Sequence, residues 1–200
     1  MMRLSASGLA CVRSGRPVFV GVGFTLAAGE ALLVLGRNGA GKSSLLRMIA
    51  GLLRVAAGRI DLAGGDPELS LAEQAHYLGH QDPLKPALTV TDNLAFWARY
   101  LGGRAAPETL AAVGLAALHD LPAAFLSAGQ RRRLSIARLI AVPRPIWLLD
   151  EPNATLDASA QARLAALMRD HLAGGGLILA ATHGPIGLAG AQELRLGETP

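Results

Sequence analysis

The first group of residues able to do chemistry is a glycine-rich loop: Gly36, Arg37, Asn38, Gly39, Ala40, Gly41, Lys42 and Ser43. Its spacing, Gly-x-x-x-x-Gly-Lys-Ser, fits the phosphate-binding loop pattern in full. In such a loop the backbone wraps around phosphates, Lys42 reaches the β- and γ-phosphates, and the Ser43 hydroxyl coordinates Mg²⁺. A chance glycine-rich turn is the alternative, but the loop lies between an apolar stretch and a helical pattern, as the motif requires. We therefore predict a nucleotide site, with Ser44 either adding a hydroxyl to the α-phosphate or lying on the helix surface.

A pair of carboxylates follows a later apolar stretch. Residues 146–149 read Ile-Trp-Leu-Leu and lead directly into Asp150 and Glu151. Taken alone, acidic residues at a strand end more often face solvent. Downstream of a phosphate-binding loop, however, Asp150 is placed to hold the hydration shell of Mg²⁺. Glu151 is then placed to polarise the attacking water, and general-base help of this kind contributes about 10²- to 10⁴-fold in rate.

A second loop of the anion-binding kind precedes these carboxylates: Leu126, Ser127, Ala128, Gly129 and Gln130, followed by three arginines. Ser127 occupies the position of a helix N-cap hydroxyl. A glycine-rich turn that opens a helix presents backbone N–H groups and the positive end of the helix dipole, and both attract anions. Two such loops in one short chain require either two phosphates or two subunits.

Three further residues gain meaning from their positions. Gln81 ends a predicted strand, where its neutral amide could touch the metal or the water and report the nucleotide to the segment that follows. His183 follows the last apolar strand, and the ends of parallel strands converge on a ligand. Asp157 could equally cap the next helix. On its own, each of the three has an ordinary structural explanation.

The apolar periodicity and the glycines predict the elements that hold these groups. Strands are expected over 4–9, 18–26, 31–35, 59–62, 145–149 and 177–181, and helices over 41–50, 91–100, 107–118, 127–141 and 158–172. This alternation implies an α/β fold with a mostly parallel sheet covered on both faces. We expect one domain over 1–200, with a nucleotide-binding core from 1–82 and 143–200 and an inserted helical subdomain over 83–142.

Composition limits the class of protein. Hydrophobic residues make up 51% of the chain against 17% charged, which excludes disorder. No uninterrupted apolar run reaches the roughly 18 residues of a transmembrane helix, and the first residues lack the layout of a signal peptide. The net charge of +4 suits an anionic small ligand or an acidic membrane surface as easily as nucleic acid. The lone Cys11 is expected to be a buried residue in a reducing compartment.

Together, the order and spacing of these motifs resemble ATP-binding cassette (ABC) ATPases over essentially the whole chain. The resemblance implies a phosphate-loop core, with a mostly parallel sheet and an antiparallel β portion, carrying a helical subdomain. It also implies a head-to-tail pair of subunits, with each ATP held between the phosphate-binding loop of one copy and residues 127–130 of the other. The four remaining roles follow from the same resemblance: Glu151 as general base, Gln81 as switch glutamine, His183 as γ-phosphate switch and Asp157 at the dimer seam.

A narrower resemblance is to the CcmA family, the ATP-binding subunits of cytochrome c maturation haem exporters. It rests on the segments Leu78-Gly79-His80-Gln81, Lys85 and Leu88-Thr89, on Cys11 with Arg13, and on Leu126-Ser127-Ala128-Gly129-Gln130-Arg131-Arg132. The match implies a peripheral protein at the cytoplasmic face of the bacterial inner membrane, working with a CcmB-like permease.

Two positions depart from the usual ABC pattern. Most members stack adenine on an aromatic residue at about position 13, where this chain has Arg13. A guanidinium plane can also stack on a base, and Phe19 is the alternative unless it faces the core. Ala128 replaces the usual glycine and would be strained at positive φ, so we expect ordinary backbone there.

Three classes of function compete. A subunit that energises a membrane transporter fits best. ABC ATPases that act on nucleic acid or ribosomes usually carry two cassettes or a long insertion, and this chain has neither, so no nucleic-acid partner is expected. The intact Lys42, Glu151 and His183 argue against a regulatory nucleotide binder that does not hydrolyse ATP.

Overall fold

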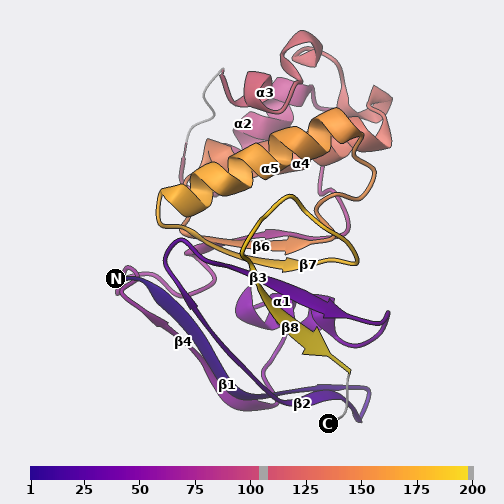
Figure 1. Ribbon diagram of the computed structural model, residues 1–200. Coiled ribbons are helices and arrows are strands. Elements are labelled where there is room, and N and C mark those ends of the chain that lie inside the picture. Colours follow the sequence, from indigo (N-terminus) through magenta and orange to yellow (C-terminus); the bar gives the residue numbers. More distant parts are fainter. Residues whose placement is uncertain (104–107, 198–200) are drawn as a thin grey trace. The chain divides into compact units, whose positions relative to one another are not determined.

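A computed structural model of the protein describes residues 1–103 and 108–197. The chain divides into two compact units (Figure 1). The first unit comprises Met1–Gly79, Pro145–Pro152 and Met168–Pro200, and the second comprises His80–Arg144 and Asn153–Leu167. Residues 153–167, which the sequence places with the core, therefore cluster with the helical unit.

The first unit contains two sheets (Figure 1). The three-stranded antiparallel sheet has the order β2-β1-β4 and consists of Arg3–Arg13 (β1), Arg16–Ala27 (β2) and Ala57–Ala63 (β4). The five-stranded parallel sheet has the order β5-β6-β7-β3-β8 and consists of Ala31–Gly36 (β3), Ala75–Leu78 (β5), Ile146–Asp150 (β6), Leu177–Ala181 (β7) and Gln192–Leu196 (β8). The predicted fold class, a mostly parallel sheet with an antiparallel portion, is confirmed.

Burial explains why the central strands have their sequences. Every residue of β6 and β7 is buried, and both strands read as nearly continuous apolar runs, which is typical of strands covered on both faces. Helix α1 (Lys42–Ile49) packs against β3, β6 and β7. Leu45 and Leu46 of this helix are fully buried in the core, as is Cys11 of β1. The core thus lies between α1 and the sheets, directly beneath the loop that joins β3 to α1.

The second unit is mainly helical. It contains α2 (Val90–Tyr100), α3 (Glu108–Ala112), α4 (Ala128–Ala141) and two short 3-10 helices, Ala116–Leu118 and Ala123–Phe125. Helices α2 and α3 pack against α4. Helix α5 (Ala158–Ala173) begins in this unit and ends in the first. Among the described residues, none of the helices combines the length and hydrophobicity needed to cross a bilayer.

Three sequence predictions fail. Gln81 does not end a strand, because β5 already stops at Leu78. The helix expected over 107–118 ends at Ala112, because Gly114 adopts a left-handed φ of 69° and the chain continues as a 3-10 turn; residue 107 lies outside the described residues. The strand β8 is absent from the predicted strands. Its only buried residue is Leu196, so this strand at the edge of the sheet lacks the apolar run that marks its neighbours.

His171, in the last turn of α5, stacks on Trp147 of β6. The ring centroids are 4.1 Å apart and the planes differ by 11°. Gly176 makes room for this ring, since a Cβ at position 176 would lie 2.2 Å from His171 Nε2. Burial lowers the pKa of His171 below its usual value, so the folded protein favours the neutral imidazole.

This burial predicts acid sensitivity. The unfolded chain takes up a proton on His171 near its ordinary pKa of about 6.5, whereas the folded state resists it. The free energy of unfolding should therefore fall as the pH drops below about 6.5. His171→Phe keeps an aromatic ring on Trp147 but cannot titrate. Urea unfolding between about pH 8 and pH 5 should show a shallower acid loss for this variant, and equal slopes would contradict the prediction.

Candidate functional site

The phosphate-binding loop is the turn from β3 into α1, as predicted. Gly36 ends the strand, Gly41 caps the helix in a left-handed conformation with φ of 100°, and Lys42 begins the helix. A Cβ at position 41 would lie 2.7 Å from side-chain atoms of both Val18 and Phe19. Phe19 is 8% exposed and belongs to the core, so it supports the loop from below.

The side chains of Lys42, His183 and Glu151 are in successive contact beside this loop. Lys42 Nζ donates to the Gly36 carbonyl at 2.8 Å and lies 3.0 Å from His183 Nε2. His183 Nε2 lies 3.5 Å from Glu151 Oε1, and its side chain is 51% exposed. A lysine, an imidazole and a carboxylate therefore form one contiguous group beside the loop, and such groups are chemically able to bind a phosphate and to take a proton from water.

Glu151 is held in an unusual backbone conformation. It follows β6 with a positive φ of 47°, and its N–H donates to the carbonyl of Ala181 in β7 at 2.9 Å. A non-glycine residue in this region costs of order 1–3 kcal/mol and is over-represented at functional sites. The turn directs the chain away from the strand immediately after Asp150.

Asp150 is 3% exposed and accepts two hydroxyl hydrogen bonds. Ser43 Oγ donates to its Oδ1 at 2.9 Å, and Tyr77 Oη donates to its Oδ2 at 3.2 Å. Arg47 Nε in turn donates to Tyr77 Oη at 3.1 Å. Burial raises the pKa of Tyr77, so the phenol keeps its proton. A hydroxyl next to a carboxylate supplies the hard oxygen ligands that Mg²⁺ prefers, and this donor set therefore fits the ion.

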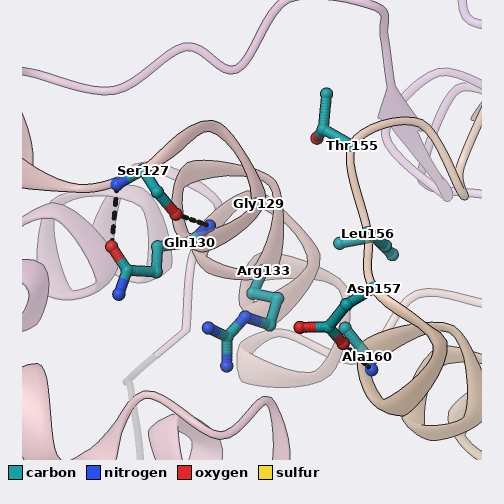
Figure 2. Close-up of a pocket in the computed structure, with 8 residues that line it drawn as sticks. All are labelled: Ser127, Gly129, Gln130, Arg133, Thr155, Leu156, Asp157 and Ala160. Atoms are coloured by element: carbon teal, nitrogen blue, oxygen red, sulfur yellow. Dashed lines mark hydrogen bonds between the residues drawn. The ribbon is translucent and has the colours of Figure 1, made fainter.

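The predicted second loop opens α4. Ser127 Oγ accepts from the Gln130 N–H at 3.2 Å, while Gln130 Oε1 accepts from the Ser127 N–H at 2.7 Å, which together make a capping box (Figure 2). Ala128 begins the helix and has no positive φ, as expected. Within the second unit the loop borders a pocket of about 150 Å³, lined by Ser127, Gly129, Gln130, Arg133, Thr155, Leu156, Asp157 and Ala160 (Figure 2).

Asp157 caps a helix, which is the structural role that its position in the sequence also allowed, and it lines this pocket. Its Oδ1 accepts from the Ala160 N–H at 2.7 Å and so caps the start of α5. One wall of the pocket comes from the start of α4 and the other from residues 155–160 (Figure 2). The role of Asp157 at a dimer seam stays a prediction.

Gln81, Ser44 and Arg13 are also predicted as site residues. Gln81 belongs to the second unit and has an exposed side chain, and Ser44 is half-buried in the first turn of α1. Arg13 is exposed at the end of β1, opposite Arg16 across the hairpin. Of the predicted residues, those of the first unit that meet around the phosphate-binding loop are Lys42, Ser43, Asp150, Glu151 and His183.

Sequence reasoning missed an ion pair beside Gln81. Asp82 Oδ1 lies 3.3 Å from Nη1 of Arg132, which is 2% exposed. Nearby, Arg138 stacks over Trp97 at 4.5 Å, and burial lowers its pKa to about 10. These residues follow Gln81 and Gln130 closely, but no local pattern in the sequence indicates that such distant segments pair.

Comparison with known proteins provides independent evidence of the family. The family model for ABC transporters matches residues 19–154. The chain is 64% identical to the cytochrome c biogenesis ATP-binding export protein CcmA of Nitrobacter winogradskyi, over 98% of both chains. It is 63% identical to the protein of the same name from Rhodopseudomonas palustris, again over 98% of both. The chain belongs to the ABC transporter family.

Solved structures agree with this family on the fold. A putative ABC transporter ATP-binding protein from Pyrococcus furiosus matches with a TM-score of 0.84 at 22% identity, over 97% of each chain. The ATP binding subunit of another ABC transporter matches with a TM-score of 0.80 at 26% identity, over 90% of this chain and 79% of the other. As a member of this family the chain binds ATP and is an ATPase. The ATPases of ABC transporters work as dimers with membrane permease partners.

The contact between Gly129 and the residue 155 carbonyl gives a prediction. A Cβ at position 129 would lie 2.8 Å from the Thr155 carbonyl oxygen, so Gly129→Ala must push two backbone segments apart. We expect a loss of about 1–3 kcal/mol in the free energy of unfolding. The matched control is Ala128→Gly, which removes a methyl group at the neighbouring helical position and should cost at most about 1 kcal/mol. Urea unfolding measures both, and a Gly129→Ala protein as stable as the wild type would refute the contact.

Proposed function

We propose that this chain is the ATP-hydrolysing subunit of an exporter that serves cytochrome c biogenesis, with haem as the expected cargo. The observation that carries the proposal is the contiguous group of Lys42, His183 and Glu151 beside the phosphate-binding loop. Full-length relatives at 60–64% identity carry the name cytochrome c biogenesis ATP-binding export protein CcmA, which supports the pathway. The resemblance to the CcmA family supports haem.

In the proposed mechanism the loop 36–43 binds the triphosphate of ATP. Lys42 turns from the Gly36 carbonyl to the β- and γ-phosphates, and His183 contacts the γ-phosphate. Glu151 accepts the proton of the attacking water. Ser43, Asp150 through water and Gln81 would hold Mg²⁺, which when bound neutralises charge on the β- and γ-phosphates.

The pocket beside residues 127–130 is proposed to complete the site of a second copy. The chain already has one phosphate-binding loop, so the helix N-terminus at Ser127 and Gly129 is left for the γ-phosphate of the partner copy's ATP. Asp157 would lie at the same seam. Closing such a dimer from 1:99 to 99:1 needs about 5.5 kcal/mol of differential binding, and several charge-assisted contacts to one phosphate are of that order.

Arg13 is proposed to stack on adenine. It is exposed at the end of the β1–β2 hairpin, whereas Phe19 is buried beneath the loop and has no free face to offer. A guanidinium plane supplies both charge and a stacking surface.

The helical subdomain, 83–142, is proposed to contact a CcmB-like permease, which would hold the chain peripherally at the cytoplasmic face of the inner membrane. Two contacts join the segment after Gln81 to helix α2: Trp97 Nε1 donates to the Pro83 carbonyl at 2.8 Å, and Lys85 Nζ lies 4.5 Å from the Phe96 ring centroid. Phe96 remains 38% exposed, which leaves an aromatic surface for the permease beside Lys85. We propose no nucleic-acid partner.

Glu151→Gln tests the catalytic assignment. The amide cannot accept a proton, so we expect ATP hydrolysis to slow by about 10²- to 10⁴-fold, while ATP binding is retained and a closed dimer accumulates. The measurements are phosphate release and light scattering with ATP. Glu193→Gln removes an exposed carboxylate of β8 and serves as the matched control. Hydrolysis at the wild-type rate by Glu151→Gln would overturn the assignment.

Complementation tests the cellular role. In cells that lack this chain, wild type and Glu193→Gln should restore haem-bearing cytochrome c, and Glu151→Gln should not. Haem staining of cytochrome c is the readout, and purification in detergent should recover the chain with a membrane-spanning partner. Normal cytochrome c in the absence of the chain, or recovery with nucleic acid, would sink the proposal.

A further inference from the structure

Tyr77 lies on the face of the sheet that carries Asp150. In the parallel pair of β5 and β6, Tyr77 is opposite Leu148. Side chains alternate along a strand, so Leu148 and Asp150 share one face. Helix α1 packs against β6 and carries Arg47 in its last turn. The fold therefore brings a phenol, a guanidinium and the proposed metal-shell carboxylate together from three elements of the first unit.

The ring of Tyr77 has a defined place. Gly79 lies against it, and a Cβ at position 79 would come within 3.0 Å of the ring. The ring packs on the hydrophobic core with its edge towards Asp150. Phenylalanine could fill the same space, so the core alone does not require the hydroxyl.

The Tyr77 hydroxyl lies between two charged side chains and forms a hydrogen bond with each of them. Arg47 Nε occupies a lone pair of Tyr77 Oη at 3.1 Å, because a guanidinium can only donate. The phenolic proton is then directed at Asp150 Oδ2, 3.2 Å away. Ser43 donates to the other carboxylate oxygen. Each oxygen of Asp150 thus receives one hydroxyl, which sets the rotation of the carboxylate and the direction of its remaining lone pairs.

We propose that Tyr77, oriented by Arg47, is a positioning residue that holds Asp150 ready to receive the water shell of the Mg²⁺ of MgATP. The inference rests on the role of Asp150 in the proposed function. Groups that orient metal-binding side chains typically contribute about 10- to 100-fold to metal affinity. Tyr77 should therefore affect how strongly Mg²⁺ strengthens nucleotide binding and leave binding without Mg²⁺ nearly unchanged.

The experiment compares nucleotide affinity with and without Mg²⁺. The full chain is titrated with a mant-labelled, non-hydrolysable ATP analogue in Mg²⁺ or in EDTA, and the ratio of the two affinities is the Mg²⁺ enhancement. Tyr77→Phe should reduce this enhancement roughly tenfold, with affinity in EDTA within about twofold of wild type. Tyr100→Phe removes the only other tyrosine hydroxyl of the chain, on the exposed side of α2, and should leave both affinities unchanged.

Variants of Arg47 test whether this residue acts on Asp150 through Tyr77. Arg47→Leu should reduce the Mg²⁺ enhancement about threefold in the wild-type background and change it little in the Tyr77→Phe background, because Arg47 acts mainly through the phenol. Arg47→Lys retains a donor and should recover most of the enhancement. Independent, fully additive losses would overturn the relay from Arg47 to Asp150.

The variant Asp150→Asn distinguishes failure of the metal-shell role of Asp150 from failure of the positioning role of Tyr77. If wild type shows no Mg²⁺ enhancement, or Asp150→Asn retains all of it, the metal-shell role of Asp150 itself fails. If Asp150→Asn abolishes the enhancement while Tyr77→Phe keeps the wild-type value, only the positioning role of Tyr77 fails. An equal loss of affinity in Mg²⁺ and EDTA for Tyr77→Phe would show that the residue supports the fold alone.

Discussion

The pairing of three adjacent parallel strands, β6, β7 and β3, holds the functional groups of the first unit together. Their carboxyl ends meet at one edge of the sheet, where the chain leaves as the phosphate-binding loop, as Asp150-Glu151 and as Thr182-His183. Backbone bonds continue past the strand ends: Glu151 N–H donates to the Ala181 carbonyl and Thr182 N–H to that of Val34. A shift in the register of any one of these strands would therefore break up the group of Lys42, Glu151 and His183.

The buried carboxylate of Asp150 at this edge is stabilised by hydrogen-bond donors from other elements. Ser43 reaches Asp150 from α1, and Tyr77 reaches it from β5. A carboxylate that is 3% exposed would be costly without such donors, because burial of an unpaired charge is strongly unfavourable. The same hydrogen bonds that make Asp150 tolerable in the interior also orient it, so stability and function use the same contacts.

In the second unit, two backbone segments lie unusually close to each other. Gly129 lies beneath the carbonyl of Thr155, and Thr155 itself has a positive φ of 64°. A loop that exposes N–H groups at the start of α4 can therefore lie next to the turn into α5. The capping box of Ser127 and Gln130 leaves the helix N-terminus ordered while the pocket beside it stays open.

Sequence alone determined the chemistry that is written locally: the phosphate-binding loop, the acidic strand end, the capped loop at 127–130, and the α/β class. Each depends on residues close together in the chain, where spacing and periodicity report structure directly. Prediction from the sequence failed where the local pattern was weak, as in the exposed edge strand β8, or was interrupted, as by Gly114 within the expected helix. Only the tertiary structure decided the partners of Asp150 and the ion pair of Asp82 with Arg132. Those contacts join elements distant in sequence, and strand order and packing create them without leaving a pattern in either segment.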